Sequence, residues 1–180
     1  MKKIRLTPDE LGEKGESHFK VICADAQLIC NKSDRDRAGW DFIVDFPFDN
    51  QEARSLDKRS APASCHVQVK TVYAGTTNVR LKLNMAERLV KGLGPSFVLV
   101  IKVDDNLSVT DAYLIHLMGD RLGHVLKRLR KEQANGTPLD GLNKKFKSKL
   151  RKSTRKALEA LAIKGQSLPS PGSNGRNSVC

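Results

Sequence analysis

Long apolar runs are missing from this sequence of 180 residues. The longest, Phe97 to Ile101, has five residues, whereas a helix that crosses a bilayer needs about twenty. Lys2 and Lys3 stand near the start, but they are not followed by the apolar stretch that a secretion signal requires. These absences exclude a bilayer-spanning helix, and we expect a cytoplasmic protein.

Cysteine is scarce, with only four residues in the chain: Cys23, Cys30, Cys65 and Cys180. They form no CxxC pair and have no histidine at zinc-finger spacing, which argues against a structural zinc site. The first three lie among apolar residues. We expect them to pack as small hydrophobic side chains in a reducing compartment.

Acidic residues are scarce in the last third of the chain. Residues 1–118 hold 17 Lys and Arg against 16 Asp and Glu, whereas residues 119–180 hold 15 against 4, so the net charges are +1 and +11. A concentrated positive field suits a polyanion, either a nucleic acid or an acidic membrane surface. The membrane is the weaker alternative, because the basic segment has few bulky apolar anchors.

Hydrophobic periodicity predicts an α/β protein. A capping box from Thr7 to Glu10, with Pro8 in the first helical position, begins a helix that runs to about residue 26. The other expected elements are an edge strand at 28–30, a polar loop at 31–39, strands at 41–46, 65–73 and 79–83, a helix at 85–93 capped by Asn84, a buried strand at 97–103, a strand at 110–117 and a helix from 122 to about 135. We expect the strands between residues 41 and 83 to form an antiparallel meander.

The change in composition divides the chain into a core at 1–118, a basic helical appendage at 119–163 and a disordered tail at 164–180. The appendage ends in a basic helix at about 142–163. Its cations form either a solvated face or an arm that contacts nucleic-acid phosphates without reading the base sequence, and we favour the arm. The candidate nucleic-acid-binding residues are Lys144, Lys145, Lys147, Lys149, Arg151, Lys152, Arg155 and Lys156.

Four polar residues, Glu16, Asp41, Gln68 and Lys70, suggest a chemical site. Gln68 and Lys70 share one face of a strand, because alternate residues point the same way. If Asp41 lies on the adjoining strand at the same end, its carboxylate, the Gln68 side-chain carbonyl and the Val69 backbone carbonyl can share one cation. Magnesium prefers such oxygen ligands and keeps several waters.

The chemistry that this set suits is phosphodiester hydrolysis. The cation polarises the phosphate and activates a water, while Lys70 orients that water or neutralises charge in the transition state. Glu16 completes the cage, directly or through a water. Each residue also has a structural interpretation: Glu16 as an ion pair with Lys20, Asp41 as a turn residue, and Gln68 with Lys70 as a solvated face.

The sequence resembles the PD-(D/E)xK nuclease superfamily, in the branch with an acid on a preceding helix, then Asp, then Gln-x-Lys. The matching stretches are Gly15-Glu16-Ser17-His18-Phe19, Ala38-Gly39-Trp40-Asp41-Phe42 and His66-Val67-Gln68-Val69-Lys70-Thr71. The order of expected elements over residues 9–117 is also similar to that of the superfamily's core. The resemblance implies a restriction-endonuclease-like core, with a helix, a mixed central sheet of about five strands and flanking helices, here extended by basic C-terminal helices.

The resemblance further implies a metal-dependent nuclease, with Mg²⁺ as cofactor and Mn²⁺ as a substitute. Glu16, Asp41, Gln68 and Lys70 would be catalytic, and Asp41, Gln68, Glu16 and the Val69 carbonyl would hold the metal. Gln68 replaces the more usual acid, which removes one carboxylate. Members that have lost activity also exist, so the alternative is a non-catalytic nucleic-acid-binding or assembly subunit on the same scaffold.

Close relatives of this kind include effectors of prokaryotic anti-phage defence and restriction. We therefore expect a DNA endonuclease, with DNA favoured over RNA and no membrane partner. A homodimer or higher assembly is expected because cutting both strands often takes two active centres. A regulatory protein partner is expected because little of the chain is left for a sensor domain.

Overall fold

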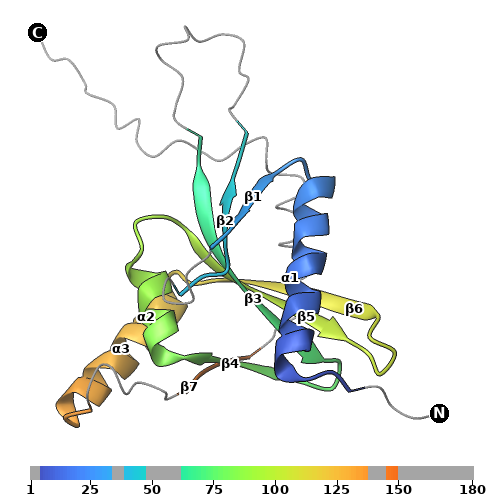
Figure 1. Ribbon diagram of the computed structural model, residues 1–180. Helices are drawn as coiled ribbons and strands as arrows, with labels where there is room; N and C mark the ends of the chain where they lie inside the picture. The colour runs from blue at the N-terminus through green and yellow to red at the C-terminus, as the bar shows by residue number, and fades with distance from the viewer. Residues whose placement is uncertain (1–4, 34–38, 48–61, 138–144, 150–180) are drawn as a thin grey trace, which may run out of the picture.

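The computed structural model describes residues 5–33, 39–47, 62–137 and 145–149. A mixed five-stranded sheet, in the order β1-β2-β3-β5-β6, forms the centre of an α/β fold (Figure 1). Its strands are β1 (Ile29–Lys32), β2 (Phe42–Asp45), β3 (Ser64–Tyr73), β5 (Ser96–Val103) and β6 (Val109–His116). The predicted edge strand is confirmed as β1, although it extends to Lys32, so Asn31 and Lys32 are not part of a loop.

Strand directions explain why the sheet is mixed. β1, β2 and β3 pair antiparallel, β3 and β5 pair parallel, and β5 and β6 pair antiparallel. Two parallel neighbours need a crossover connection, and β4 (Asn78–Lys82) with α2 (Leu83–Lys91) supplies it. The antiparallel meander predicted through 79–83 is therefore wrong for its last strand. The apolar run of β5 takes the protected position beside β3, while β4, with only one apolar face, leaves the sheet.

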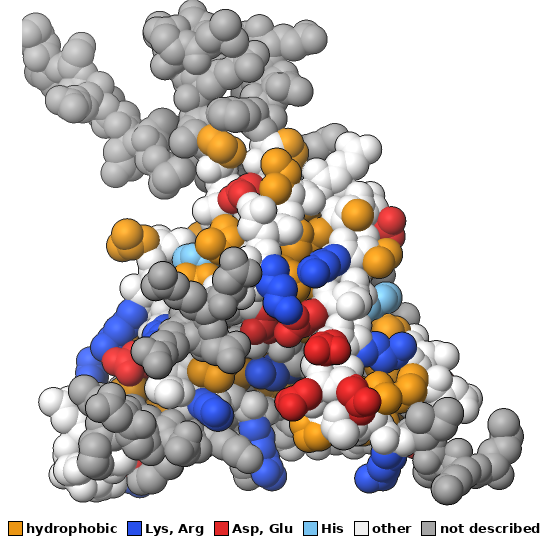
Figure 2. Space-filling view, viewed as in Figure 1, with side chains coloured by type: hydrophobic (Ala, Val, Ile, Leu, Met, Phe, Trp, Pro, Cys, Tyr) orange, Lys and Arg blue, Asp and Glu red, His pale blue; other side chains and the backbone are white. Residues whose placement is uncertain are grey.

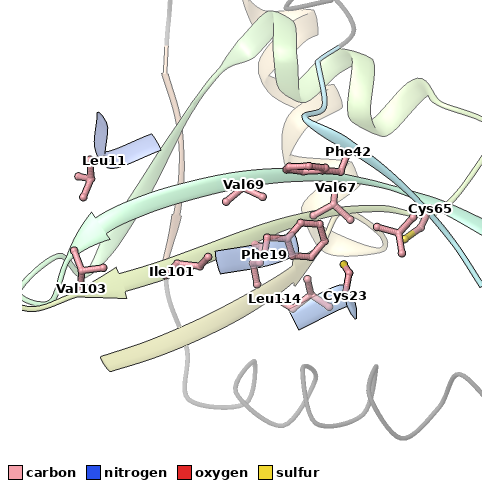
Figure 3. Packing of buried hydrophobic residues seen from close by; sticks show 12 residues of the cluster. Leu11, Phe19, Cys23, Phe42, Cys65, Val67, Val69, Ile101, Val103 and Leu114 are labelled. Atoms are coloured by element: carbon pink, nitrogen blue, oxygen red, sulfur yellow. The ribbon is translucent and has the colours of Figure 1, made fainter. Parts of the chain in front are cut away.

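The N-terminal helix α1 (Pro8–Asp25) begins as predicted. The Thr7 hydroxyl accepts from the Glu10 N–H at 3.3 Å, and the Glu10 carboxylate accepts from the Thr7 N–H at 2.8 Å, so the capping box is complete. Phe19 and Cys23 of this helix are buried against the sheet. Figure 3 shows them among Val67, Val69, Ile101 and Leu114, in the core between α1 and the sheet.

A second core covers the opposite face of the sheet. Val98 and Val100 of β5 pack there with Leu89 of α2 and with Val79 and Leu81 of β4. β5 is therefore apolar on both faces, which is why its residues do not alternate, and its predicted burial is confirmed.

The helices α2 and α3 pack together through Ala86, Val125 and their neighbours. α3 (Asp120–Ala134) confirms the helix predicted from 122 to about 135. α2 begins two residues earlier than predicted, with Lys82 as its N-cap, and the Asn84 side chain instead accepts from the Met85 N–H at 2.8 Å. The prediction that Asn84 caps this helix is therefore wrong, because the buried Leu83 is already helical.

Three cysteines are free thiols, as predicted. Cys23 and Cys65 are buried in the core below α1, and Cys30 is half-buried. Burial raises the pKa of Cys65 to about 12 and raises that of Cys23 even further. Thiols of this kind stay protonated and behave as small apolar side chains.

The predicted basic helix at 142–163 is wrong where the structure describes it. Lys145–Lys149 is a strand, β7, which pairs antiparallel with β4 in a separate two-stranded ribbon. The stretch Lys-Phe-Lys-Ser-Lys alternates with period 2, which is the pattern of a strand with one apolar position. The rest of the predicted helix and the tail at 164–180 lie outside the described residues.

The backbone of α1 comes very close to the Thr71 side chain of β3 at Gly15. A Cβ atom at this position would lie 1.8 Å from Thr71 Oγ1 and 3.1 Å from Thr71 Cβ, so only glycine fits. Gly12, one turn earlier on the same helix, has no atom of the described residues within 4 Å of its would-be Cβ apart from its chain neighbours and the backbone of its own helix. The contact at Gly15 sets the distance of α1 from the sheet and therefore the place of the next residue, Glu16.

We predict that Gly15→Ala and Gly12→Ala change stability in opposite directions. Gly15→Ala should lower the free energy of unfolding by about 1–3 kcal/mol through overpacking, and Thr71→Ala in the same chain should recover most of that loss. Gly12→Ala should raise it by about 0.5–1 kcal/mol through helix propensity. Urea denaturation of the four proteins measures this. Equal stability of the two alanine variants would contradict the close approach.

Candidate metal and phosphate site

The candidate site lies where β2 and β3 separate. Their pairing ends at Phe42 and Val67, while β3 continues to Tyr73. Beyond Val67, the edge of β3 that β2 no longer covers carries the N–H and C=O of Val69. Asp41, which directly precedes β2, donates its own N–H to the Val67 carbonyl at 3.0 Å and is therefore held at this fork.

The Asp41 side chain continues the interaction where the strand pairing stops. Its Oδ2 accepts from the Val69 N–H at 2.8 Å and from the Gln68 side-chain amide. Its backbone carbonyl accepts from the Ser33 N–H at 2.8 Å. Two hydrogen bonds to the carboxylate and two to the backbone of Asp41 thus hold this half-buried residue in place, which is the rigidity that a ligand or catalytic group needs.

Gln68 joins the carboxylate to the backbone of β3. Its side chain is 2% exposed, and its Nε2 also lies 3.3 Å from the Val69 carbonyl oxygen. Asp41 Oδ2 and Val69 O therefore both lie within hydrogen-bonding distance of the same amide nitrogen. The other end of that amide, Oε1, is buried and accepts no hydrogen bond from the described residues. Leaving such an acceptor unpaired is costly, so it marks a place where a further group can bind.

Glu16 faces this fork from α1. Its carboxylate forms an ion pair with Lys32 at the end of β1, at 2.9 Å, and is 24% exposed. The ion pair with Lys20 that the sequence allowed is not the one that forms. The negative charge of Glu16 is close enough to help raise the pKa of Asp41.

Lys70 acts on Asp41 from the other side. It is half-buried on β3, two residues after Gln68, and its positive charge helps to hold down the pKa of Asp41. Burial is nevertheless the largest influence, so the pKa of Asp41 lies above its ordinary value. Figure 2 shows acidic side chains gathered near the centre of the face in view, with Lys and Arg side chains above and below them.

The structure thus brings together the four residues that the sequence singled out. Asp41, Gln68 and the Val69 backbone are in direct contact, and Glu16 and Lys70 both act electrostatically on Asp41. Their catalytic roles stay predictions. Sequence reasoning missed Lys32, because it had been placed in a loop. The β1 register, which sets Lys32 opposite Phe42, brings it beside Asp41.

One further observation concerns metal binding at the site, and another concerns membrane spanning. Among the residues that the structure describes, no group of three or more His, Cys, Asp or Glu side chains is arranged to hold a metal ion. Any cation here would therefore depend on the Gln68 amide and the Val69 carbonyl as well as on carboxylates. No described helix has the length and apolar character needed to span a membrane.

The predicted nucleic-acid-binding cations divide into two groups. Lys145, Lys147 and Lys149 lie on β7 and not on a helix. The other five lie outside the described residues: Lys144, Arg151, Lys152, Arg155 and Lys156.

Comparisons of the chain with protein-family models, with curated proteins and with solved structures find no match.

We predict that Asp41→Asn changes how stability depends on pH. Because the folded-state pKa of Asp41 is raised, the wild-type protein should lose free energy of unfolding as pH rises from about the ordinary value of 3.8 through the raised one. The asparagine side chain of the variant cannot ionise but still offers an oxygen to the Val69 N–H. The stability of the variant relative to wild type should therefore increase as pH rises through this window.

Denaturant titrations of both proteins between pH 3 and 8 measure this difference. Its trend with pH is the readout, because a constant offset reports only an altered hydrogen bond. A difference that stays the same at every pH would contradict the burial of an ionised Asp41.

Proposed function

We propose that this protein is a metal-dependent nuclease that hydrolyses phosphodiester bonds, with DNA as the favoured substrate. The observation that carries the proposal is the convergence of Asp41 Oδ2 and Val69 O on the Gln68 amide, whose own oxygen is buried without a partner among the described residues. Turning this amide about its last torsion would direct its oxygen to the same point. Three oxygens of the kind that Mg²⁺ or Mn²⁺ accepts would then face one position.

Each residue has a distinct task in this proposal. Asp41, Gln68 and the Val69 carbonyl hold the cation, and Glu16 supplies a second negative charge directly or through a water. A bound Mg²⁺ supplies Lewis acidity and an activated water. Lys70, on the same strand face as Gln68, orients the attacking water or neutralises charge on the phosphate in the transition state.

The electrostatics support a cation at this place. Burial and Glu16 both disfavour the ionised form of Asp41, so a positive charge arriving here relieves an existing cost. The ammonium group of Lys32 already neutralises part of that charge through Glu16. A divalent cation that uses Glu16 as a ligand would therefore displace the Lys32 ammonium group. It would place a larger positive charge closer to Asp41 than Lys32 does.

The restriction-endonuclease-like character of the core belongs to the same proposal. It is supported by the order of α1, the mixed sheet and the crossover through α2, with the polar set at the fork between β2 and β3. A role in prokaryotic defence or restriction, action in the cytoplasm, a homodimer and a regulatory protein partner are proposals that follow from the same resemblance.

A second candidate function is a non-catalytic nucleic-acid-binding or assembly subunit. One observation favours it: Gln68 is neutral and Glu16 is already paired with Lys32, which leaves little free negative charge for a metal. The two candidates differ in whether the fork binds a divalent cation.

We predict that Mg²⁺-dependent cleavage depends on the fork. Purified protein with Mg²⁺ should cut labelled DNA, and Asp41→Asn and Lys70→Ala should each lower the rate by about a hundredfold or more through lost metal binding or lost charge stabilisation. Lys127→Ala removes an exposed lysine on α3 and serves as the matched control, with unchanged cleavage. Labelled RNA under the same conditions tests the substrate preference. Full activity of both site variants would reject the assignment.

Metal binding should also show as thermal stabilisation. Mg²⁺ or Mn²⁺ should raise the melting temperature of the wild-type protein by mass action, and should not raise that of Asp41→Asn. Calorimetric titration gives the stoichiometry. Salt-sensitive DNA binding by a protein that shows no metal-dependent shift would instead favour the non-catalytic subunit.

A further inference from the structure

A groove opens directly beside the candidate site. It has a volume of about 510 Å³ and is lined by Lys70 and Val72 of β3, by residues 75–77 between the strands, and by residues 78–80 of β4. We call it the β4 groove. Lys70 belongs both to this groove and to the proposed catalytic set, so a ligand in the groove lies next to the site.

The chemistry of the groove suits an anion with several charges. Lys70 and Arg80 both line it, and three further lining side chains, those of Thr76, Thr77 and Asn78, carry hydrogen-bond donors. Among the described residues, no acidic one lines it. Within the same part of the chain, no carboxylate forms an ion pair with Lys70, Arg80 or Lys82.

The exposed face of β4 extends this positive charge beyond the groove. β4 alternates between buried Val79 and Leu81 and exposed Asn78, Arg80 and Lys82. Lys147 is the backbone partner of Arg80, and Lys145 is the partner of Lys82. The positive charge exposed on β4 therefore runs from Arg80 to Lys82.

We propose that the β4 groove, together with Arg80 and Lys82 of β4, binds the phosphate backbone of the nucleic-acid strand that enters the candidate site. The proposal rests on the nuclease function above and adds to it the path of the substrate. It moves the main phosphate-binding surface from the predicted basic helix to the strand that follows β3. Contacts with phosphates alone predict binding without sequence preference.

A membrane surface suits this region less well than a nucleic acid does. The region is concave, whereas binding to a bilayer surface needs bulky apolar anchors. The exposed large apolar side chains of the described residues are Val21, Ile29, Leu93, Val109 and Met118, and none of them lines the groove.

The test measures binding without cleavage. In the Asp41→Asn background, we expect Arg80→Gln with Lys82→Gln to weaken binding of a fluorescent DNA by about tenfold or more at low salt. The slope of log affinity against log salt should fall by about two, one for each phosphate contact that is lost. The matched control is Lys127→Gln with Arg130→Gln, which removes one lysine and one arginine from exposed positions on α3. It should leave the slope nearly unchanged.

Two more measurements make the result specific. The charge-preserving pair Arg80→Lys with Lys82→Arg should retain most of the binding, which separates charge from folding. In a parallel titration, vesicles containing phosphatidylserine replace DNA. If the Arg80→Gln, Lys82→Gln protein loses binding to the vesicles but keeps binding to DNA, the proposal is overturned.

Equal DNA binding and equal salt slopes for the groove pair and the α3 pair would also overturn it. Failure of the nuclease function is recognised separately, by wild-type cleavage that does not depend on Asp41 or on a divalent ion. The binding experiment in the Asp41→Asn background is unaffected by that outcome, so the two failures are distinguishable.

Discussion

The hydrogen bond from the Val69 N–H to the Asp41 carboxylate is the interaction on which the site depends. Strand pairing between β2 and β3 stops at Val67, and this side chain satisfies the next free donor of β3. The same carboxylate accepts from the Gln68 side chain. Asp41 therefore pairs the Val69 N–H at the point where the strands separate and also holds Gln68 in place. A fork of this kind places a backbone carbonyl, that of Val69, beside a carboxylate.

The electrostatics of the fork work against the stability of the isolated protein. Burial and the charge of Glu16 raise the pKa of Asp41, while Lys70 and the two hydrogen bonds to its Oδ2 lower it. The balance leaves the ionised carboxylate less favourable than in water. Sites arranged to bind a charged ligand commonly keep such a cost in the free protein, because the ligand relieves it. The buried Gln68 Oε1 has no hydrogen-bond partner among the described residues, which is a comparable cost that a bound group would relieve.

Positive charge is arranged around the fork in a way that complements a phosphate strand. Lys70 lines the β4 groove and also acts on the Asp41 carboxylate, and Arg80 and Lys82 continue along β4. The net charge of +12 therefore has a spatial meaning beyond its concentration in the last third of the sequence. The ribbon of β4 and β7 brings the backbone of a late segment, Lys145–Lys149, beside an earlier strand.

The sequence by itself determined the elements whose signals are local. The Thr7–Glu10 capping box began α1, period-2 alternation placed Gln68 and Lys70 on one strand face, and the unbroken apolar run of β5 indicated burial on both sides. Those signals also led to the four candidate residues, because each motif is short and continuous. Tertiary structure decided everything that depends on pairing between distant segments.

Four features depend on pairing between distant segments: the parallel pairing of β3 with β5, the position of β4 outside the main sheet, the strand at 145–149 and the ion pair between Glu16 and Lys32. Period-2 alternation identifies a strand but does not say which other strand it pairs with. The lysine-rich stretch at 145–149 is compatible with a helix or a strand until its neighbour in the fold is known. The physical reason is that local sequence sets which conformations are favourable, whereas the choice among partners depends on which arrangement buries the most apolar surface in the complete fold.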